Sequence, residues 1–211
     1  MSYIGIIGAE RLDAGNLIRR QQAEQMLKEG YDLTVIKIQT GWEMGIDGKW
    51  RFEIADPFLE TSAIEDYVKP RFGESINIRF ILRDTQILTA YPEFETLTLY
   101  VMYSPKTGLA GYYNPETNGI VISMGTPKSE FSYQIEGVLL HEIQHLIQEI
   151  EGFAKGGSPK AIGMRRYLRL AGEVEARNIC LRHFLSEDER HRSLRTKTQD
   201  VPDRKQIVRL K

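Results

Sequence analysis

The segment from Phe131 to Glu151 limits the possible folds of this chain more than any other part of the sequence. Its apolar residues recur at helical spacing, which predicts one long amphipathic helix; they are Leu139, Leu140, Ile143, Leu146, Ile147 and Ile150. The same segment contains His141-Glu142-Ile143-Gln144-His145. Because residues i and i+4 share one face of a helix, we expect both imidazoles to point to the same side. Apolar residues flank the motif, so other elements should cover this face.

Two histidines at this spacing can bind one metal ion. Zinc accepts neutral imidazole nitrogens at about 2.0–2.1 Å, and a catalytic zinc site has three protein ligands and one open position. His141 and His145 are therefore candidate ligands of Zn²⁺. Glu142 is the candidate general base, because it could reach a water beside the metal without binding the metal itself. The alternative is a pair of surface histidines on an amphipathic helix.

We expect the third ligand on a second long helix, from about Met164 to Leu185. Glu173 is the first candidate, because it flanks a row of small residues that would allow close approach to the first helix; the row is Gly172, Ala176 and Cys180. Arg177 lies one turn further on and is expected to orient the Glu173 carboxylate. The alternative is a solvated ladder of Arg169, Glu173 and Arg177 on the helix surface.

Glu175 is kept as the reserve ligand. It is expected to point about 160° away from Glu173 around the helix, toward Leu168 and Met164. A buried carboxylate at that position would need an explanation of its own.

The remaining sequence predicts a mixture of strands and helices. Strands are expected at residues 3–7, 33–39, 97–103, 110–113 and 119–124, a helix at 16–29, and a hairpin at 37–54 with Asp47-Gly48 at its turn. Residues 76–82 fit a strand or the start of a helix. The strand around Ile120–Ile122 is a candidate for pairing with an extended peptide. This order of elements predicts an α+β fold.

Composition adds limits on location and partners. The chain has 211 residues, enough for a sizeable core, and a single cysteine, Cys180, which fits a reducing compartment. It contains no apolar run that could span a membrane and no basic region before its short apolar N-terminal stretch, so we expect a cytoplasmic protein. Residues 160–211 carry an excess of Lys and Arg. This basic segment would either contact nucleic acid or fold back on the acidic body of the chain.

The motif residues resemble a known group of enzymes. The run His141–His145 followed by Glu173-Val174-Glu175-Ala176 is similar to the gluzincins, zinc metallopeptidases with a HExxH helix and a downstream glutamate ligand. Several of those families carry the ligand glutamate three residues before an alanine, as Glu173 stands before Ala176. The wider pattern resembles the zincin-like domains of large polyvalent proteins from phages and mobile elements. The phrases that carry this resemblance are TGWEMGIDGKWRFEI, AYPEF, GYYNPETNGIVIS, HEIQHLIQEIEGFAKGGSP and YLRLAGEVEARN.

The resemblance implies a zincin-like fold, with a small mixed sheet packed on the active-site helix and the ligand glutamate on a second helix. The pattern along the chain indicates an N-terminal region at 1–90 (or part of the same domain), a core at 91–186 and a basic arm at 187–211, and the resemblance makes the core the catalytic domain. It implies Zn²⁺ held by His141, His145 and Glu173, with Glu142 as the base. The oxyanion donor would be one of Tyr112, Tyr113, Tyr167 and Arg177.

The implied function is hydrolysis of a peptide bond in a peptide or protein substrate. Polyvalent proteins are thought to enter the host cell with phage DNA and act on host defences, so the target would be a host protein. Two alternatives stay open: an inactive zincin-fold binding module, and a nucleic-acid-associated accessory protein that acts through the basic arm.

Overall fold

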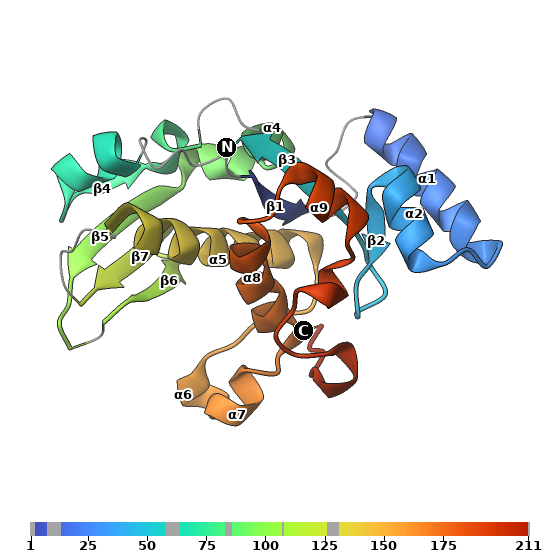
Figure 1. The fold of residues 1–211 in the computed structure, drawn as a ribbon. Helices are drawn as coiled ribbons and strands as arrows, with labels where there is room; N and C mark the ends of the chain where they lie inside the picture. The colour runs from blue at the N-terminus through green and yellow to red at the C-terminus, as the bar shows by residue number, and fades with distance from the viewer. Residues whose placement is uncertain are drawn as a thin grey trace. The chain divides into compact units, whose positions relative to one another are not determined.

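A computed structural model describes residues 3–7, 14–57, 64–82, 86–106, 108–125 and 131–210. Helices and strands are mixed along the chain (Figure 1), which confirms the α+β class. The contacts divide the chain into two units, Met1–Tyr3 with Asp56–Ile143 and Ile4–Ala55 with Gln144–Lys211. The border falls inside helix α5 (Phe131–Glu151), which is continuous across it. The expected divisions at residues 90 and 186 stay a prediction.

The first unit is built on a mixed sheet. Its four strands are β4 (Ser75–Asn77), β5 (Thr98–Tyr103), β6 (Ala110–Asn114) and β7 (Gly119–Met124), in the order β4-β5-β7-β6. Strands β5 and β7 are parallel, and the other two pairs are antiparallel. The strands expected at 97–103, 110–113 and 119–124 are thereby confirmed. The segment at 76–82 begins as β4 and continues as a 3₁₀ helix, η3 (Ile78–Phe80).

The sheet packs against the first half of α5. A Cβ atom on Gly111 of β6 would collide with Cγ1 of Val138, so the strand and the helix are in direct contact there. Ile120 and Ile122 of β7 and Leu139 of α5 are fully buried, as an apolar core between a sheet and a helix requires. The unit also contains further short helical segments: η1 (Ile64–Val68), η2 (Lys69–Arg71), α4 (Gln86–Ala90) and η4 (Pro92–Thr96).

The second unit contains a three-stranded sheet in the order β1-β3-β2. Its strands are β1 (Tyr3–Ile7), β2 (Trp42–Met44) and β3 (Trp50–Pro57). Strands β2 and β3 form the predicted antiparallel hairpin, with Glu43 opposite Arg51. Gly48 has φ of 76° in the turn, a conformation that glycine adopts without steric cost. A small apolar core around Trp42 and Trp50 includes residues of helix α1 (Ala14–Lys28).

The prediction of a strand at residues 33–39 is wrong, because Leu33–Thr40 forms helix α2. Its β-branched residues favour a strand by propensity, but the capping residues at its two ends favour a helix. The Asp32 side chain accepts a hydrogen bond from Thr34 N at 2.7 Å, which caps the first turn. Gly41 ends the helix with φ of 80°. The helix buries Ile36, Lys37 and Thr40, and Ile36 and Thr40 lie one turn apart on the same face.

The second long helix is also shorter than expected. It is split into α7 (Met164–Tyr167) and α8 (Ala171–Arg182), which follow α6 (Pro159–Ile162). Between α7 and α8, Leu170 pairs with Ile207 near the C-terminus, which interrupts the helical hydrogen bonds.

The C-terminal residues continue through three short helical segments. These are α9 (Glu187–Arg192), η5 (Arg195–Lys197) and η6 (Asp203–Lys205). Arg195 is buried and pairs with Glu43 and Glu175, so this part of the basic segment folds onto acidic groups of its own unit. Within the described residues, no helix is long and apolar enough to cross a membrane. The N-terminal stretch, in which no basic region precedes the apolar residues, includes residues 1–2 and 8–13, which lie outside the described residues.

Candidate metal centre

The three predicted ligand residues lie together. One ligand atom from each of His141, His145 and Glu173 falls within 4.8 Å of the others. Helix α5 places the two histidines one turn apart on the same face, as their spacing predicts. Glu173 lies in the first turn of α8, where the positive end of the helix dipole favours a carboxylate. The group therefore combines two imidazoles with one carboxylate, a donor set found in catalytic zinc sites.

A glycine loop completes the surroundings of Glu173. The N–H of Gly157 donates a 2.9 Å hydrogen bond to Oε1 of Glu173, whose side chain is almost fully buried. A Cβ atom on Gly156 would lie 2.6 Å from Cε1 of His145 and would also collide with Oε1 of Glu173. The loop can approach both ligands this closely because it has no side chain there.

The hydrogen bonds of Gln148 determine which nitrogen of His145 faces Glu173. Nε2 of Gln148 donates to the carbonyl of Gly172 at 2.9 Å and to Oε1 of Glu175 at 3.1 Å. Both partners can only accept, so Oε1 of Gln148 must face Nδ1 of His145, at 2.8 Å. Nδ1 of His145 therefore carries a proton and donates it.

The Nε2 atom of His145 is the one left for a metal. It lies 3.3 Å from Oε1 of Glu173. In a neutral imidazole protonated on Nδ1, this nitrogen is an acceptor that faces another acceptor. A cation between the two atoms, a proton or a metal ion, turns this repulsion into attraction. The residues present thus fit a metal ion bound at Nε2.

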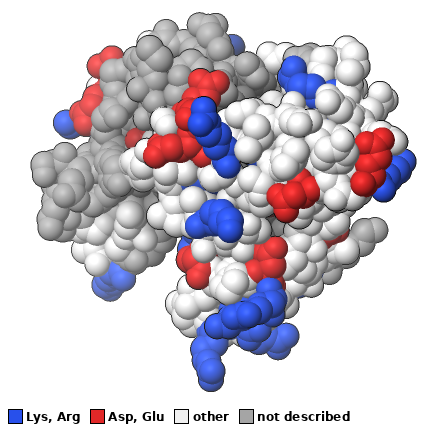
Figure 2. All heavy atoms as spheres, turned by 45° about the vertical axis from the view of Figure 1, so that its right-hand side comes forward, with Lys and Arg blue, Asp and Glu red and all other residues white. Residues whose placement is uncertain are grey.

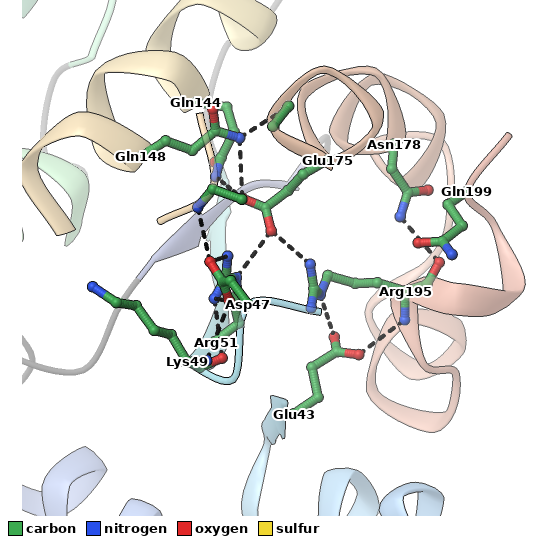
Figure 3. A network of polar contacts seen from close by, with 12 residues as sticks. Glu43, Asp47, Lys49, Arg51, Gln144, Gln148, Glu175, Asn178, Arg195 and Gln199 are labelled. Atoms are coloured by element: carbon green, nitrogen blue, oxygen red, sulfur yellow. Dashed lines mark hydrogen bonds and ion pairs between the residues drawn. The ribbon is translucent and has the colours of Figure 1, made fainter. Parts of the chain in front are cut away.

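Glu175 does not point toward Leu168 and Met164, which corrects the expectation for this residue. Its carboxylate is buried and lies at the centre of a polar network (Figure 3). Oε1 accepts hydrogen bonds from Gln144 at 2.9 Å and Gln148 at 3.1 Å. Oε2 accepts from Arg51 at 2.9 Å and Arg195 at 2.7 Å. A buried carboxylate with four donors is satisfied within the protein.

The cations around Glu175 come from distant parts of the chain. Arg51, on β3, forms a bidentate pair with Asp47 at 2.7 and 2.8 Å and stacks over Phe153, 3.6 Å from the ring centroid. Arg195 also donates its backbone N–H to Glu43 at 3.0 Å. Burial alone would raise the pKa of Glu175, but Arg51 and Arg195 outweigh it and lower that pKa. The carboxylate therefore stays ionised at neutral pH.

Glu142, the predicted base, is buried on α5 beneath the edge strand β6. A Cβ atom on Gly111 of β6 would lie 3.0 Å from Oε1 of Glu142. The strand backbone thus passes directly over this carboxylate, since glycine leaves room for it. Glu142 is 8% exposed, so its carboxylate lies at the margin of the core.

Three further expectations need correction. Arg177 does not orient Glu173: it donates to Asp200 at 2.7 Å and to the carbonyl of Leu168 at 2.7 Å. Gly172 allows close approach of the backbone of loop residues 154–156, and not only of helix α5 as expected. A Cβ atom added at this position would collide with that loop backbone. The strand β7 around Ile120–Ile122 cannot accept a peptide, because β5 and β6 already pair with it on both sides.

Two of the four candidate oxyanion donors have hydrogen-bond partners elsewhere in the structure. The hydroxyl of Tyr113 is hydrogen-bonded to Oδ1 of Asn118 at 3.0 Å, and Arg177 is held by Asp200. Tyr112 on β6 is 56% exposed and follows Gly111 directly. Tyr112 and Tyr167 stay as candidates.

Sequence reasoning missed the residues that support the ligands. Gln144 and Gln148 were present as polar residues one turn apart within an apolar helix face, and that spacing was the available signal. Nothing in the local sequence connects either glutamine with Glu175 or Arg51.

Comparison with known proteins gives a match to a family model. Residues 5–61 match the family model described as large polyvalent protein associated domain 23. This stretch contains the hairpin with Glu43, Asp47 and Arg51, and it ends before α5 and α8. No curated protein and no solved structure was found to match the chain. In its N-terminal quarter, this chain is therefore similar to a domain that accompanies large polyvalent proteins.

Proposed function

We propose that this protein is a zinc-dependent metallopeptidase with a zincin-like arrangement of sheet and helices. The observation that carries the proposal is the cluster of His141, His145 and Glu173, whose ligand atoms lie within 4.8 Å of one another. Glu142 stands beside the first of these residues, where a general base is needed. A structural zinc site would have no use for a carboxylate at that position, because Glu142 does not contribute a ligand.

His141, His145 and Glu173 would hold the zinc ion. Bound zinc supplies Lewis acidity, which polarises the scissile carbonyl and lowers the pKa of water toward about 7. Gln148 keeps Nδ1 of His145 protonated and so presents Nε2 to the metal. Gly157 keeps Glu173 in place through its N–H.

Glu142 would perform the proton transfers. Its carboxylate accepts the proton of the attacking water and then delivers it to the nitrogen of the leaving amine. Tyr112 or Tyr167 would donate a hydrogen bond to the oxygen that becomes negative in the transition state.

The substrate would bind along β6. This strand ends the sheet order β4-β5-β7-β6, so none of the described strands pairs with its outer edge. An extended peptide can pair with such an edge through its backbone. Gly111 brings the edge within contact of Glu142, which would place a bound peptide beside the base.

The similarity to a large polyvalent protein associated domain supports a role in a phage or mobile element. We propose that the substrate is a host protein and that the enzyme acts in the cytoplasm of the host cell.

The test combines metal analysis with peptide cleavage. We expect about one zinc per chain in the wild type and loss of zinc in Glu173→Ala. Glu142→Gln should retain zinc but cleave labelled casein at least about 100-fold more slowly, because general-base catalysis supplies that order of rate. Glu149→Gln, an exposed change on the same helix, is the matched control for both measurements.

Two results would contradict this function. Undiminished cleavage in Glu142→Gln would remove Glu142 from the mechanism. Absence of bound metal in the wild type after zinc is supplied would leave a binding module with a zincin-like fold as the better description.

Nucleic-acid binding is a second candidate, favoured by a group of exposed cations. Lys and Arg gather at the lower end of the face in Figure 2. The exposed cations of α6, α7, η6 and their neighbours are Lys160, Arg165, Arg166, Arg169, Arg204, Lys205 and Arg209. If this surface binds DNA phosphates, affinity for a short duplex should fall steeply with salt and weaken in a double variant, Arg165→Ala with Arg166→Ala. Salt-independent or absent binding would exclude it.

A further inference from the structure

The hairpin β2–β3 shares buried polar contacts with the residues that support the metal ligands. We propose that Arg51 of this hairpin positions His145 through Glu175 and Gln148. The segment that matches the polyvalent protein associated domain is then a structural part of the metal centre, not a separate module. The role in zinc binding rests on the function proposed above, whereas the effect on His145 can be measured without metal.

The first step is the orientation of the Gln148 amide. Gln148 is 1% exposed, so water does not offer its polar atoms alternative partners. If the amide were reversed, its oxygen would face the carbonyl of Gly172 and the carboxylate of Glu175, two acceptors. Glu175 therefore determines that the oxygen of Gln148 faces His145 and that Nδ1 of His145 is protonated.

The second step is the position of Glu175. Its Oε2 atom accepts hydrogen bonds from Arg51 and Arg195, at 2.9 and 2.7 Å. These charge-assisted bonds are stronger than bonds between neutral groups and fix the carboxylate in one rotamer. The Oε1 atom is consequently directed at Gln144 and Gln148.

The third step connects Arg51 to the turn of the hairpin. Asp47 binds both terminal nitrogens of Arg51, and the N–H of Ala154 donates to Asp47 at 2.8 Å. The guanidinium carbon also lies 3.6 Å from the ring centroid of Phe153, three residues before Gly156 in the loop that approaches the ligands. Arg51 is 2% exposed and has few alternative positions. The hairpin turn thus determines where Glu175 is, and Glu175 determines how His145 is held.

Stability alone is a weak reason for such a network. Buried ion pairs repay their desolvation cost only in part, and well-packed apolar residues often stabilise a core equally well. Orientation of a metal ligand is a benefit that apolar residues could not supply. Arg51, Glu175 and Gln148 are therefore positioning residues, since none of them belongs to the ligand group.

Gln148→Met and Arg51→Lys test the proposal, with Glu53→Gln as the control. Methionine keeps the length of Gln148 but has no amide, and lysine cannot form the bidentate pair with Asp47. Glu53 lies on β3 two residues from Arg51 and forms an equally buried pair with Arg182, at 2.7 and 2.8 Å. The control therefore removes a similar interaction that contacts neither Glu175 nor Gln148 directly and reaches Glu175 only through Lys37, Glu43 and Arg195.

The first measurement is the zinc dissociation constant, obtained by competition with a coloured chelator on variants shown to be folded by circular dichroism. Loss of a group that orients a metal ligand weakens metal binding by about 10–100-fold. We expect a loss of this size in Gln148→Met, a loss in the same direction in Arg51→Lys, and wild-type affinity in Glu53→Gln. Wild-type affinity in either test variant, or an equal loss in the control, would overturn the proposal.

The second measurement is the tautomer of His145 in metal-free protein, from nitrogen chemical shifts of ¹⁵N-labelled histidine at alkaline pH. We expect the proton on Nδ1 in the wild type and in Glu53→Gln, and a shift toward Nε2 in Gln148→Met. The same tautomer in all three proteins would overturn the positioning role. If the wild type binds no zinc, the proposed function fails, but this measurement still decides whether the network holds His145.

Discussion

At the scale of single residues, the candidate site depends on two glutamates with different tasks. Glu173 lies 3.3 Å from His145 and accepts from the loop at Gly157. Glu175, two residues later, faces Arg51 and Arg195 instead. The sequence preferred Glu173 as the ligand, and the structure places it beside His145. Burial of Glu175 is explained by its cations rather than by a metal.

Gly156→Ala should damage the metal site without unfolding the protein. The new Cβ atom would lie 2.6 Å from Cε1 of His145, so the loop must move away from the ligands. Overpacking of this kind costs about 1–3 kcal/mol, and 1.4 kcal/mol corresponds to tenfold in affinity. We therefore expect zinc affinity to fall by about tenfold or more, measured by chelator competition. Retained affinity would show that the loop can shift freely.

At the scale of elements, the length of a helix and its apolar period decided whether it could be predicted from the sequence. Helix α5 has a strong apolar period over 21 residues, and its predicted bounds are those observed. Helix α2 has 8 residues rich in β-branched side chains, so propensity favoured a strand over the caps at Asp32 and Gly41.

Gly41→Ala should destabilise the protein at the end of α2. The φ of 80° costs a residue with a side chain about 1–2 kcal/mol. The added Cβ atom would also lie 2.7 Å from Cε2 of Phe52 on β3. We expect a lower urea midpoint in equilibrium unfolding. An unchanged midpoint would mean that the end of α2 is not held in the left-handed conformation.

Gly137→Ala should have the opposite effect. Gly137 lies within α5, and a Cβ atom there would meet nothing within 4 Å. Alanine costs less conformational entropy than glycine in a helix, by about 0.5–1 kcal/mol. The urea midpoint should therefore rise, and zinc binding should stay at the wild-type level. A fall in stability would show that the helix needs glycine for another reason.

At the scale of the whole molecule, buried charges link segments that are far apart in the chain. Burial raises the pKa of Glu43, but Lys37 and Arg195 outweigh it and the pKa is lowered from its ordinary value of 4.5. Burial likewise raises the pKa of Asp47, but hydrogen bonds from Arg51 outweigh it, and the result lies below the ordinary value of 3.8. Both groups therefore favour the folded state while they are ionised.

Acid should destabilise the protein through these carboxylates. Their contribution is complete above the ordinary values of 4.5 and 3.8 and is lost as pH falls below them, through the lowered values of the folded state. We expect the urea midpoint to fall below about pH 4.5. Asp47→Asn should be less stable at neutral pH and should lose less stability in acid. An equally steep loss in that variant would assign the acid sensitivity to other groups.

The sequence by itself determined the α+β class, helix α5, the β2–β3 hairpin and the shared face of His141 and His145. These features follow from periodicity and turn residues, which act over a few positions of the chain. Only the tertiary structure decided which residues support the ligands. Gln144 meets Glu175 across 31 positions and Arg51 meets Glu175 across 124. Such pairs form because a buried polar group needs a hydrogen-bond partner. The spacing of residues along the chain does not indicate which distant residue that partner is.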